Sequence, residues 1–84
     1  MLNIHYFASL REKLGTANEK VHCDFAVVKT VADLQRYLVE SHGESRTILS
    51  ENSTRVAVNQ KLADRDTAIC EGDEIAFFPP VTGG

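Results

Sequence analysis

Apolar side chains recur at every second position near the start of the chain. Residues 2–6 alternate in this way, and a period of two is typical of a half-buried strand. Residues 8–14 then favour a short helical turn that Gly15 closes. Alternation resumes over residues 19–25, which predicts a second strand paired with the first as an antiparallel hairpin.

The middle of the chain carries the strongest helical pattern. Thr30 and Asp33 have the spacing of a capping box, in which two side chains satisfy free backbone N–H groups at a helix start. Apolar residues then recur at helical spacing, and Gly43 is a suitable stop. The pattern predicts one main helix over residues 30–42, with a weaker short helix at 44–49.

Two further strands are expected in the second half of the chain. Residues 55–59 alternate, and a turn after them leads to a short edge strand that includes Leu62. The last strand covers residues 74–78 and ends at Pro79, because proline cannot donate to a strand ladder. A short element is expected near residues 65–70.

The resulting order is strand, strand, helix, strand, strand. One main helix packed on a mixed sheet of four or five strands is the α+β fold called the β-grasp, or ubiquitin-like, fold. In this fold the first and last strands must lie side by side in the centre of the sheet. We therefore expect a single β-grasp domain over residues 1–80, followed by a flexible tail over residues 81–84.

Length and charge exclude several classes of protein. The 84 residues suit one domain. The net charge is −3 and the basic residues are scattered, whereas nucleic-acid binding usually shows as a basic patch. The sequence has neither a signal peptide nor an apolar run long enough to span a bilayer. We expect a cytoplasmic protein that does not bind nucleic acid or membranes.

Side-chain chemistry gives no candidate active site. The three histidines lack metal-ligand spacing, and the motifs of hydrolases and nucleotide-binding enzymes are absent from the sequence. Cys23 and Cys70 are interpreted as free thiols that act as small buried apolar residues. Asp33 is interpreted as a helix cap. We expect no metal, no bound cofactor and no catalytic side chain.

The last residues of the sequence are the exception. Pro79 and Pro80 stiffen the exit from the final strand, and Gly83 and Gly84 carry no side chains. A stiff segment with a bare tip can enter a narrow channel and place its carboxylate in the active site of another protein. The alternative is an ordinary frayed terminus.

Three segments carry a resemblance to a known family. They are Phe7-Ala8-x-x-Arg11-Glu12, Val58-Asn59-Gln60-x-Leu62, and the whole closing block from Gly72 to Gly84. With them the sequence resembles the small, sulfur-carrier subunits of molybdopterin synthase, along nearly its full length. Residues 17–53 match in pattern more than in identity.

The resemblance implies a mechanism that uses the C-terminus. An adenylating and sulfurating enzyme would use ATP to activate the Gly84 carboxylate, and a sulfur donor would then replace AMP to leave a thiocarboxylate. The thiocarboxylate would pass its sulfur to precursor Z in the large subunit of molybdopterin synthase. The complex implied is a heterotetramer of two small and two large subunits, in which the small subunit donates sulfur without catalytic side chains.

Strand parity predicts a docking surface on the sheet face away from the helix. Phe7, Leu62 and Phe78 are expected to lie there, with Arg11 at the rim, and an exposed apolar cluster usually marks an interface. The segment that leads to the Gly83-Gly84 tip is expected to contact the partner as well: Pro79, Pro80, Val81 and Thr82. The alternative is that the aromatic residues cover a second small core.

Three rival functions remain. A sulfur carrier for another pathway, such as thiamine synthesis, shares the fold and the Gly-Gly end. A ubiquitin-like modifier would be joined to lysine side chains. A β-grasp binding module would have a tail with no role in its activity.

Overall fold

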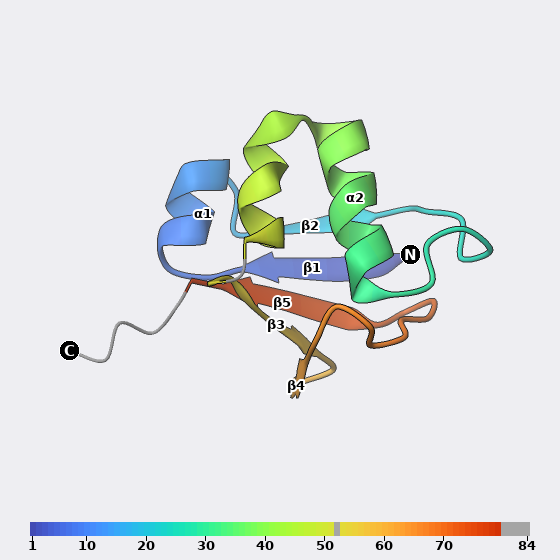
Figure 1. The fold of residues 1–84 in the computed structure, drawn as a ribbon. Coiled ribbons are helices and arrows are strands. Elements are labelled where there is room, and N and C mark those ends of the chain that lie inside the picture. The colour runs from blue at the N-terminus through green and yellow to red at the C-terminus, as the bar shows by residue number, and fades with distance from the viewer. Residues whose placement is uncertain (52, 80–84) are drawn as a thin grey trace.

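Five strands, two α-helices and one 3₁₀ helix make up the part of the chain that this computed structural model describes, residues 1–51 and 53–79 (Figure 1). In chain order they are β1 (Leu2–Tyr6), α1 (Ser9–Leu14), β2 (Asn18–Val21), α2 (Val31–His42), the 3₁₀ helix η1 (Glu44–Ser50), β3 (Arg55–Val58), β4 (Lys61–Ala63) and β5 (Glu74–Phe78).

The five strands form one mixed sheet in the order β2-β1-β5-β3-β4. Its central pair, β1 and β5, runs parallel, with Ile4 opposite Ile75, while the other neighbours are antiparallel. The first and last strands therefore lie side by side in the centre. This confirms the predicted β-grasp fold, and the sheet has the larger of the two expected strand numbers.

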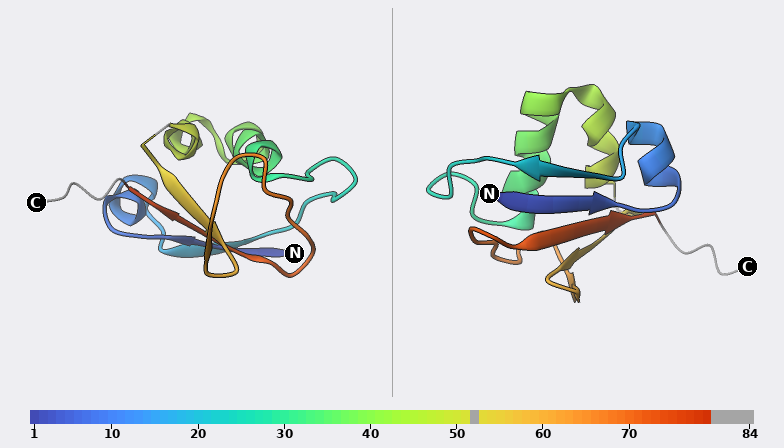
Figure 2. Two further views of the ribbon diagram at one scale, coloured as in Figure 1. Left: turned by 60° about the horizontal axis from the view of Figure 1, so that its bottom comes forward. Right: turned by 180° about the vertical axis from the view of Figure 1, so that it is seen from behind.

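The core lies between the sheet and the helices, which all cover the same face (Figures 1 and 2). The inward positions of the two central strands are fully or almost fully buried, as parity predicted: Leu2, Ile4, Tyr6, Ile75 and Phe77. Val31, Leu34 and Leu38 of α2 pack against them. The opposite face of the sheet carries none of the described helices, so its side chains are free to form a surface.

Helix α2 begins with the capping box that the sequence predicted. The Thr30 hydroxyl accepts a hydrogen bond from the Asp33 N–H at 3.3 Å, and the Asp33 carboxylate accepts from the N–H groups of Lys29 and Thr30 at 3.0 and 3.2 Å. The bond from Lys29 contributes most to lowering the pKa of Asp33 below its ordinary value of 3.8. The cap therefore works best with a charged carboxylate.

Strand β2 is shorter than predicted, and the expected strand over residues 19–25 is wrong beyond Val21. The cause is Asp24, whose carboxylate accepts from the Ala26 N–H at 2.9 Å and whose carbonyl accepts from the Val28 N–H at 2.8 Å. Aspartate often turns the chain in this way. Cys23 lies in a loop, but its side chain packs against the core. It therefore continues the alternating pattern beyond Val21 without belonging to the strand.

The two cysteines occupy different environments. Both are free, and Cys23 is half-buried; burial raises the pKa of its thiol. Cys70 is exposed, so the prediction that it is a small buried residue is wrong. Its neighbour Ile69 takes the core position, and the Cys70 N–H donates to the Asp73 carboxylate in the following turn.

A buried polar cluster joins η1 to the β1–β2 hairpin. Arg46 of η1 is only 8% exposed and donates to both carboxylate oxygens of Glu19, at 3.1 and 3.3 Å. The Tyr6 hydroxyl donates to the same carboxylate at 2.5 Å, and the Arg46 guanidinium lies 5.6 Å from the centre of the Tyr6 ring. Burial, followed by the bond to Glu19, raises the pKa of Tyr6 above its ordinary value.

Candidate functional site

Two aromatic side chains meet where the central strands end. Phe78 is the last residue of β5 and Phe7 follows β1, so both project from the face opposite the core. Their rings pack edge to face, with centroids 6.3 Å apart. Phe7 is 49% exposed and Phe78 is half-buried. The structure thus brings together two of the predicted docking residues.

Leu62 lies on the same face but farther along the sheet. It is 78% exposed on β4 and stands opposite Ala57 of β3, which in turn stands opposite Ala76 of β5. Strand spacing separates Leu62 from Phe78 by about 10–12 Å. Between them lie two small side chains, Ala57, which is 8% exposed, and Ala76, which is half-buried. We call Phe7, Leu62 and Phe78, with these two alanines, the outer-face surface.

Backbone hydrogen bonds hold the end of β1 next to the end of β5. The Phe7 N–H donates to the Phe77 carbonyl at 3.1 Å and so continues the central ladder by one bond. The chain then turns at Ala8 into α1, where Arg11 is exposed. Arg11 lies on α1, four residues beyond Phe7, and its place at the rim of the docking surface stays a prediction.

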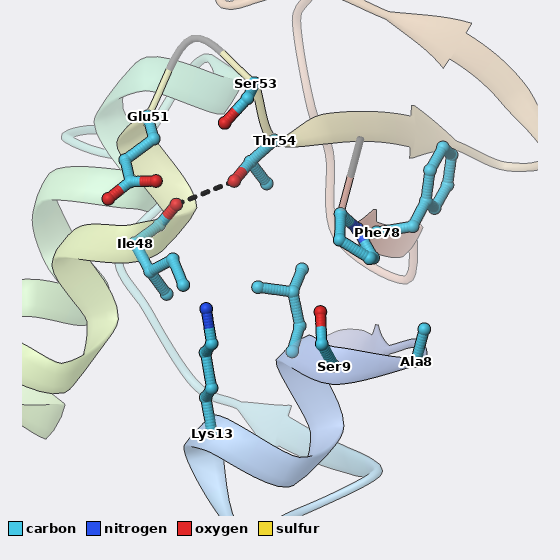
Figure 3. A pocket seen from close by; sticks show the side chains of 10 residues that line it. Ala8, Ser9, Lys13, Ile48, Glu51, Ser53, Thr54 and Phe78 are labelled. Carbon is cyan, nitrogen blue, oxygen red and sulfur yellow. Dashed lines mark hydrogen bonds between the residues drawn. The ribbon is translucent and has the colours of Figure 1, made fainter. Parts of the chain in front are cut away.

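A groove lies on the other side of Phe78, between α1 and η1 (Figure 3). Its volume is about 790 Å³, and its lining includes Ala8, Ser9, Lys13, Ile48, Phe78 and Pro79. On the η1 side, the Thr54 hydroxyl donates to the Ile48 carbonyl at 2.7 Å. We call this cavity the α1–η1 groove. Apart from Phe78 and Pro79, none of these residues was a predicted site residue, because helical spacing does not show which segments border one cavity.

The predicted tail falls at the boundary of the described structure. Pro79 directly follows β5 and is half-buried at the groove. The other predicted tail residues lie outside the described residues: Pro80, Val81, Thr82, Gly83 and Gly84. The chain therefore leaves its described part between the outer-face surface and the α1–η1 groove.

The described residues offer little conventional chemistry. Within ranges 1–51 and 53–79, no group of three or more His, Cys, Asp or Glu side chains is arranged to hold a metal ion. The three histidines are exposed or half-buried. In the same ranges, no helix has the length and apolar character needed to cross a bilayer.

Comparison with known proteins places the chain in a family. Residues 4–84 match the model of the ThiS family. The chain belongs to the ThiS family. It is 39% identical to the molybdopterin synthase sulfur carrier subunit of Haemophilus influenzae and 38% identical to that of Escherichia coli, over the full length of all three chains. These matches confirm the resemblance that the sequence indicated.

The solved structures agree with this membership. The crystal structure of SAMP1, a small archaeal modifier protein from Haloferax volcanii, superposes with a TM-score of 0.76 at 30% identity. The match covers 99% of this chain and 98% of that one. The ThiS-family member described here thus shares its fold with this small archaeal modifier protein over nearly the full length of both chains.

Proposed function

We propose that this protein is a sulfur carrier for molybdopterin synthase and that it works through the carboxylate of Gly84. The observation that carries the proposal is the full-length match, at 39% and 38% identity, to two molybdopterin synthase sulfur carrier subunits. The closing block from Gly72 to Gly84 also contains the Pro79-Pro80 and Gly83-Gly84 pairs, which would give the stiff segment and bare tip that such chemistry needs.

The proposed sulfur transfer proceeds in three steps. A Gly84 carboxylate oxygen attacks the α-phosphate of ATP on an adenylating enzyme, and pyrophosphate leaves. Sulfide from the donor then attacks the acyl carbon as HS⁻, AMP leaves with the electron pair of the acyl C–O bond, and loss of the sulfur-bound proton gives the thiocarboxylate. In the large subunit of the synthase, this sulfur attacks a carbon of precursor Z and displaces an oxygen from it, and water then cleaves the bond between the Gly84 acyl carbon and the sulfur. The sulfur stays on precursor Z and the Gly84 carboxylate re-forms. Adenylation is needed because a carboxylate ion is a poor electrophile, whereas AMP is a good leaving group.

The same proposal assigns the partners. The large subunit would bind the outer-face surface and receive the tail, with Pro79, Pro80, Val81 and Thr82 lining the path to Gly83 and Gly84. Arg11 would add a charged contact at the rim. We propose a heterotetramer of two small and two large subunits. ATP would be consumed by the adenylating enzyme in the cytoplasm, and this chain would bind no cofactor itself.

The test is the intact mass of the protein after incubation with the adenylating enzyme, ATP and a sulfur donor. We expect a gain equal to the exchange of one oxygen for one sulfur, and fragmentation should place it on Gly84. A chain without Gly83 and Gly84 is the matched control and should keep its mass. An unchanged mass of the complete chain, with an enzyme shown to be active on another carrier, would contradict the proposal.

A second candidate is a protein modifier, which the 30% identity to the small archaeal modifier protein favours. A modifier would form isopeptide bonds with lysine side chains once activated. The loaded protein should therefore be mixed with the large subunit and precursor Z in one reaction and with cell proteins in another. Dithiolene formation supports the molybdopterin pathway, isopeptides support the modifier, and neither product favours a carrier for another pathway.

A further inference from the structure

The turn between β1 and α1 places an alanine where glycine is the usual residue. Ala8 has φ 53° and ψ −129°. These angles belong to the second residue of a type II′ turn, and the Leu10 N–H closes that turn by donating to the Phe7 carbonyl at 3.1 Å. A side chain in this conformation is crowded by its own backbone, whereas glycine adopts it freely.

Structure on both sides of Ala8 imposes these angles. Before it, the Phe7 N–H is held in the central ladder by the Phe77 carbonyl. After it, Leu10 is 1% exposed and anchors α1 in the core, while the Arg11 N–H donates to the Ala8 carbonyl at 3.1 Å. The backbone at position 8 therefore cannot relax to a more common conformation without breaking these contacts.

Other positions with positive φ have ordinary explanations. Gly15, Gly43 and Gly72 have φ of 75°, 98° and 88°, where glycine carries no penalty. Asn59 and Gln60, with φ of 51° and 71°, form the two-residue turn between β3 and β4, in which positive φ is usual. Among residues 1–51 and 53–79, Ala8 is thus the one alanine held at positive φ.

The Ala8 methyl group has no internal role that would account for the strain. Ala8 is exposed, so its side chain adds nothing to the core. It lines the α1–η1 groove on the same side as Phe78, across from Ile48 and Glu51 (Figure 3). Its neighbour Phe7 belongs to the outer-face surface. The methyl group therefore lies at the junction of the groove and that surface, where the chain leaves toward Gly84.

We infer that Ala8 is a partner-contact residue, and that its methyl group packs against the large subunit when the outer-face surface is bound. This inference rests on the proposed function. Strained backbone in folded proteins is concentrated at binding and catalytic sites, and here the strained residue adjoins Phe7 in the chain and lines the α1–η1 groove together with Phe78 and Pro79. The partner thus binds across the junction as well as on the flat sheet face.

The first test replaces Ala8 with glycine and measures two quantities that should move in opposite directions. Ala8→Gly removes the crowding and should raise Tm by about 4–8 °C. It also removes the methyl contact and should weaken binding to the large subunit at least about threefold, measured by calorimetry. A higher Tm with unchanged affinity would overturn the inference, as would a Tm that does not rise.

A D-alanine at position 8 separates the methyl contact from backbone rigidity. It prefers positive φ and keeps the turn stiff, but it moves the methyl group to the other side of Cα. The chain can be assembled by ligating a synthetic 1–22 thioester to a recombinant 23–84 fragment, because residue 23 is a cysteine. A chain made in the same way with L-alanine is the matched control.

The D-alanine chain should be more stable than the control and should bind the large subunit more weakly, like Ala8→Gly. Binding equal to the control would show that only rigidity matters and would overturn the methyl contact. The unmodified chain is measured first. If it does not bind the large subunit at all, the proposed function fails, and that result is distinct from a selective effect at Ala8.

Discussion

Phe78 and Phe77 are adjacent on β5 and face opposite sides of the sheet, which makes them a matched pair. Phe77 is fully buried, whereas Phe78 packs on exposed Phe7. We expect Phe78→Ala to weaken binding to the large subunit by about tenfold or more, because exposed aromatic residues often dominate interfaces. Calorimetric titration with the large subunit measures the affinity.

Stability measurements provide the control for this prediction. Phe78→Ala should stay folded in circular dichroism and urea unfolding, while Phe77→Ala should lose about 3–5 kcal/mol from its free energy of unfolding. If Phe78→Ala unfolds, Phe78 covers a second small core and is no docking residue. Phe78→Ala with unchanged affinity would equally exclude Phe78 from the interface.

At the scale of the element, the start of α2 should make stability depend on pH. Hydrogen bonds from the Lys29 and Thr30 N–H groups lower the pKa of Asp33 below 3.8. A lowered pKa means that the charged carboxylate stabilises the fold at every pH above its ordinary pKa. This stabilisation is lost as the pH falls through the lower pKa of the folded state. Asp33→Asn should flatten that part of the pH profile, measured by urea unfolding.

Thr30→Ala is the matched control for Asp33→Asn. It removes the other half of the capping box and should cost about 1 kcal/mol of the free energy of unfolding. Most of that loss should persist at acidic pH, since the threonine hydroxyl does not titrate there. If Asp33→Asn has the same acid profile as the unchanged chain, Asp33 does not cap α2 as a carboxylate.

At the scale of the whole molecule, Arg46 and Glu19 join η1 to the β1–β2 hairpin through a pair that is largely shielded from water. Arg46→Leu removes the guanidinium from the Glu19 carboxylate, which keeps the His42 ring nitrogen as a neighbour at 3.8 Å, and should lower the free energy of unfolding by about 2 kcal/mol. Glu19→Leu should also destabilise the protein, because the guanidinium then loses its carboxylate and keeps the Ser45 hydroxyl, at 3.2 Å, as an acceptor. Urea unfolding of both variants measures these losses.

The double variant tests whether the pair acts as a unit. Arg46→Leu with Glu19→Leu should recover part of the loss, since replacing both members of a buried pair with apolar residues avoids an unpaired charge. Purely additive losses would show that the two side chains contribute independently. The outcome bears on function because η1 forms one wall of the α1–η1 groove.

Local patterns in the sequence determined most of the elements and the candidate chemistry. The period of two placed β1 and β5, and the capping box placed the start of α2, because these features depend on neighbours a few residues apart. Parity within strands correctly directed Phe77 into the core and Phe78 out of it. The closing Gly83-Gly84 pair, on a predicted β-grasp pattern, suggested a carrier, and the names of the two sulfur carrier relatives agree with that reading.

Only the tertiary structure decided what depends on distant segments. Alternation over residues 19–25 predicted a longer β2, but Asp24 ends the pairing and Cys23 reaches the core from a loop. Cys70 is exposed because Ile69 takes the adjacent core position. The α1–η1 groove, the buried Arg46 and the strained Ala8 were not predicted. Each arises where elements far apart in sequence pack together. Contacts of this kind cannot be read from a short stretch of sequence, whereas periodicity can.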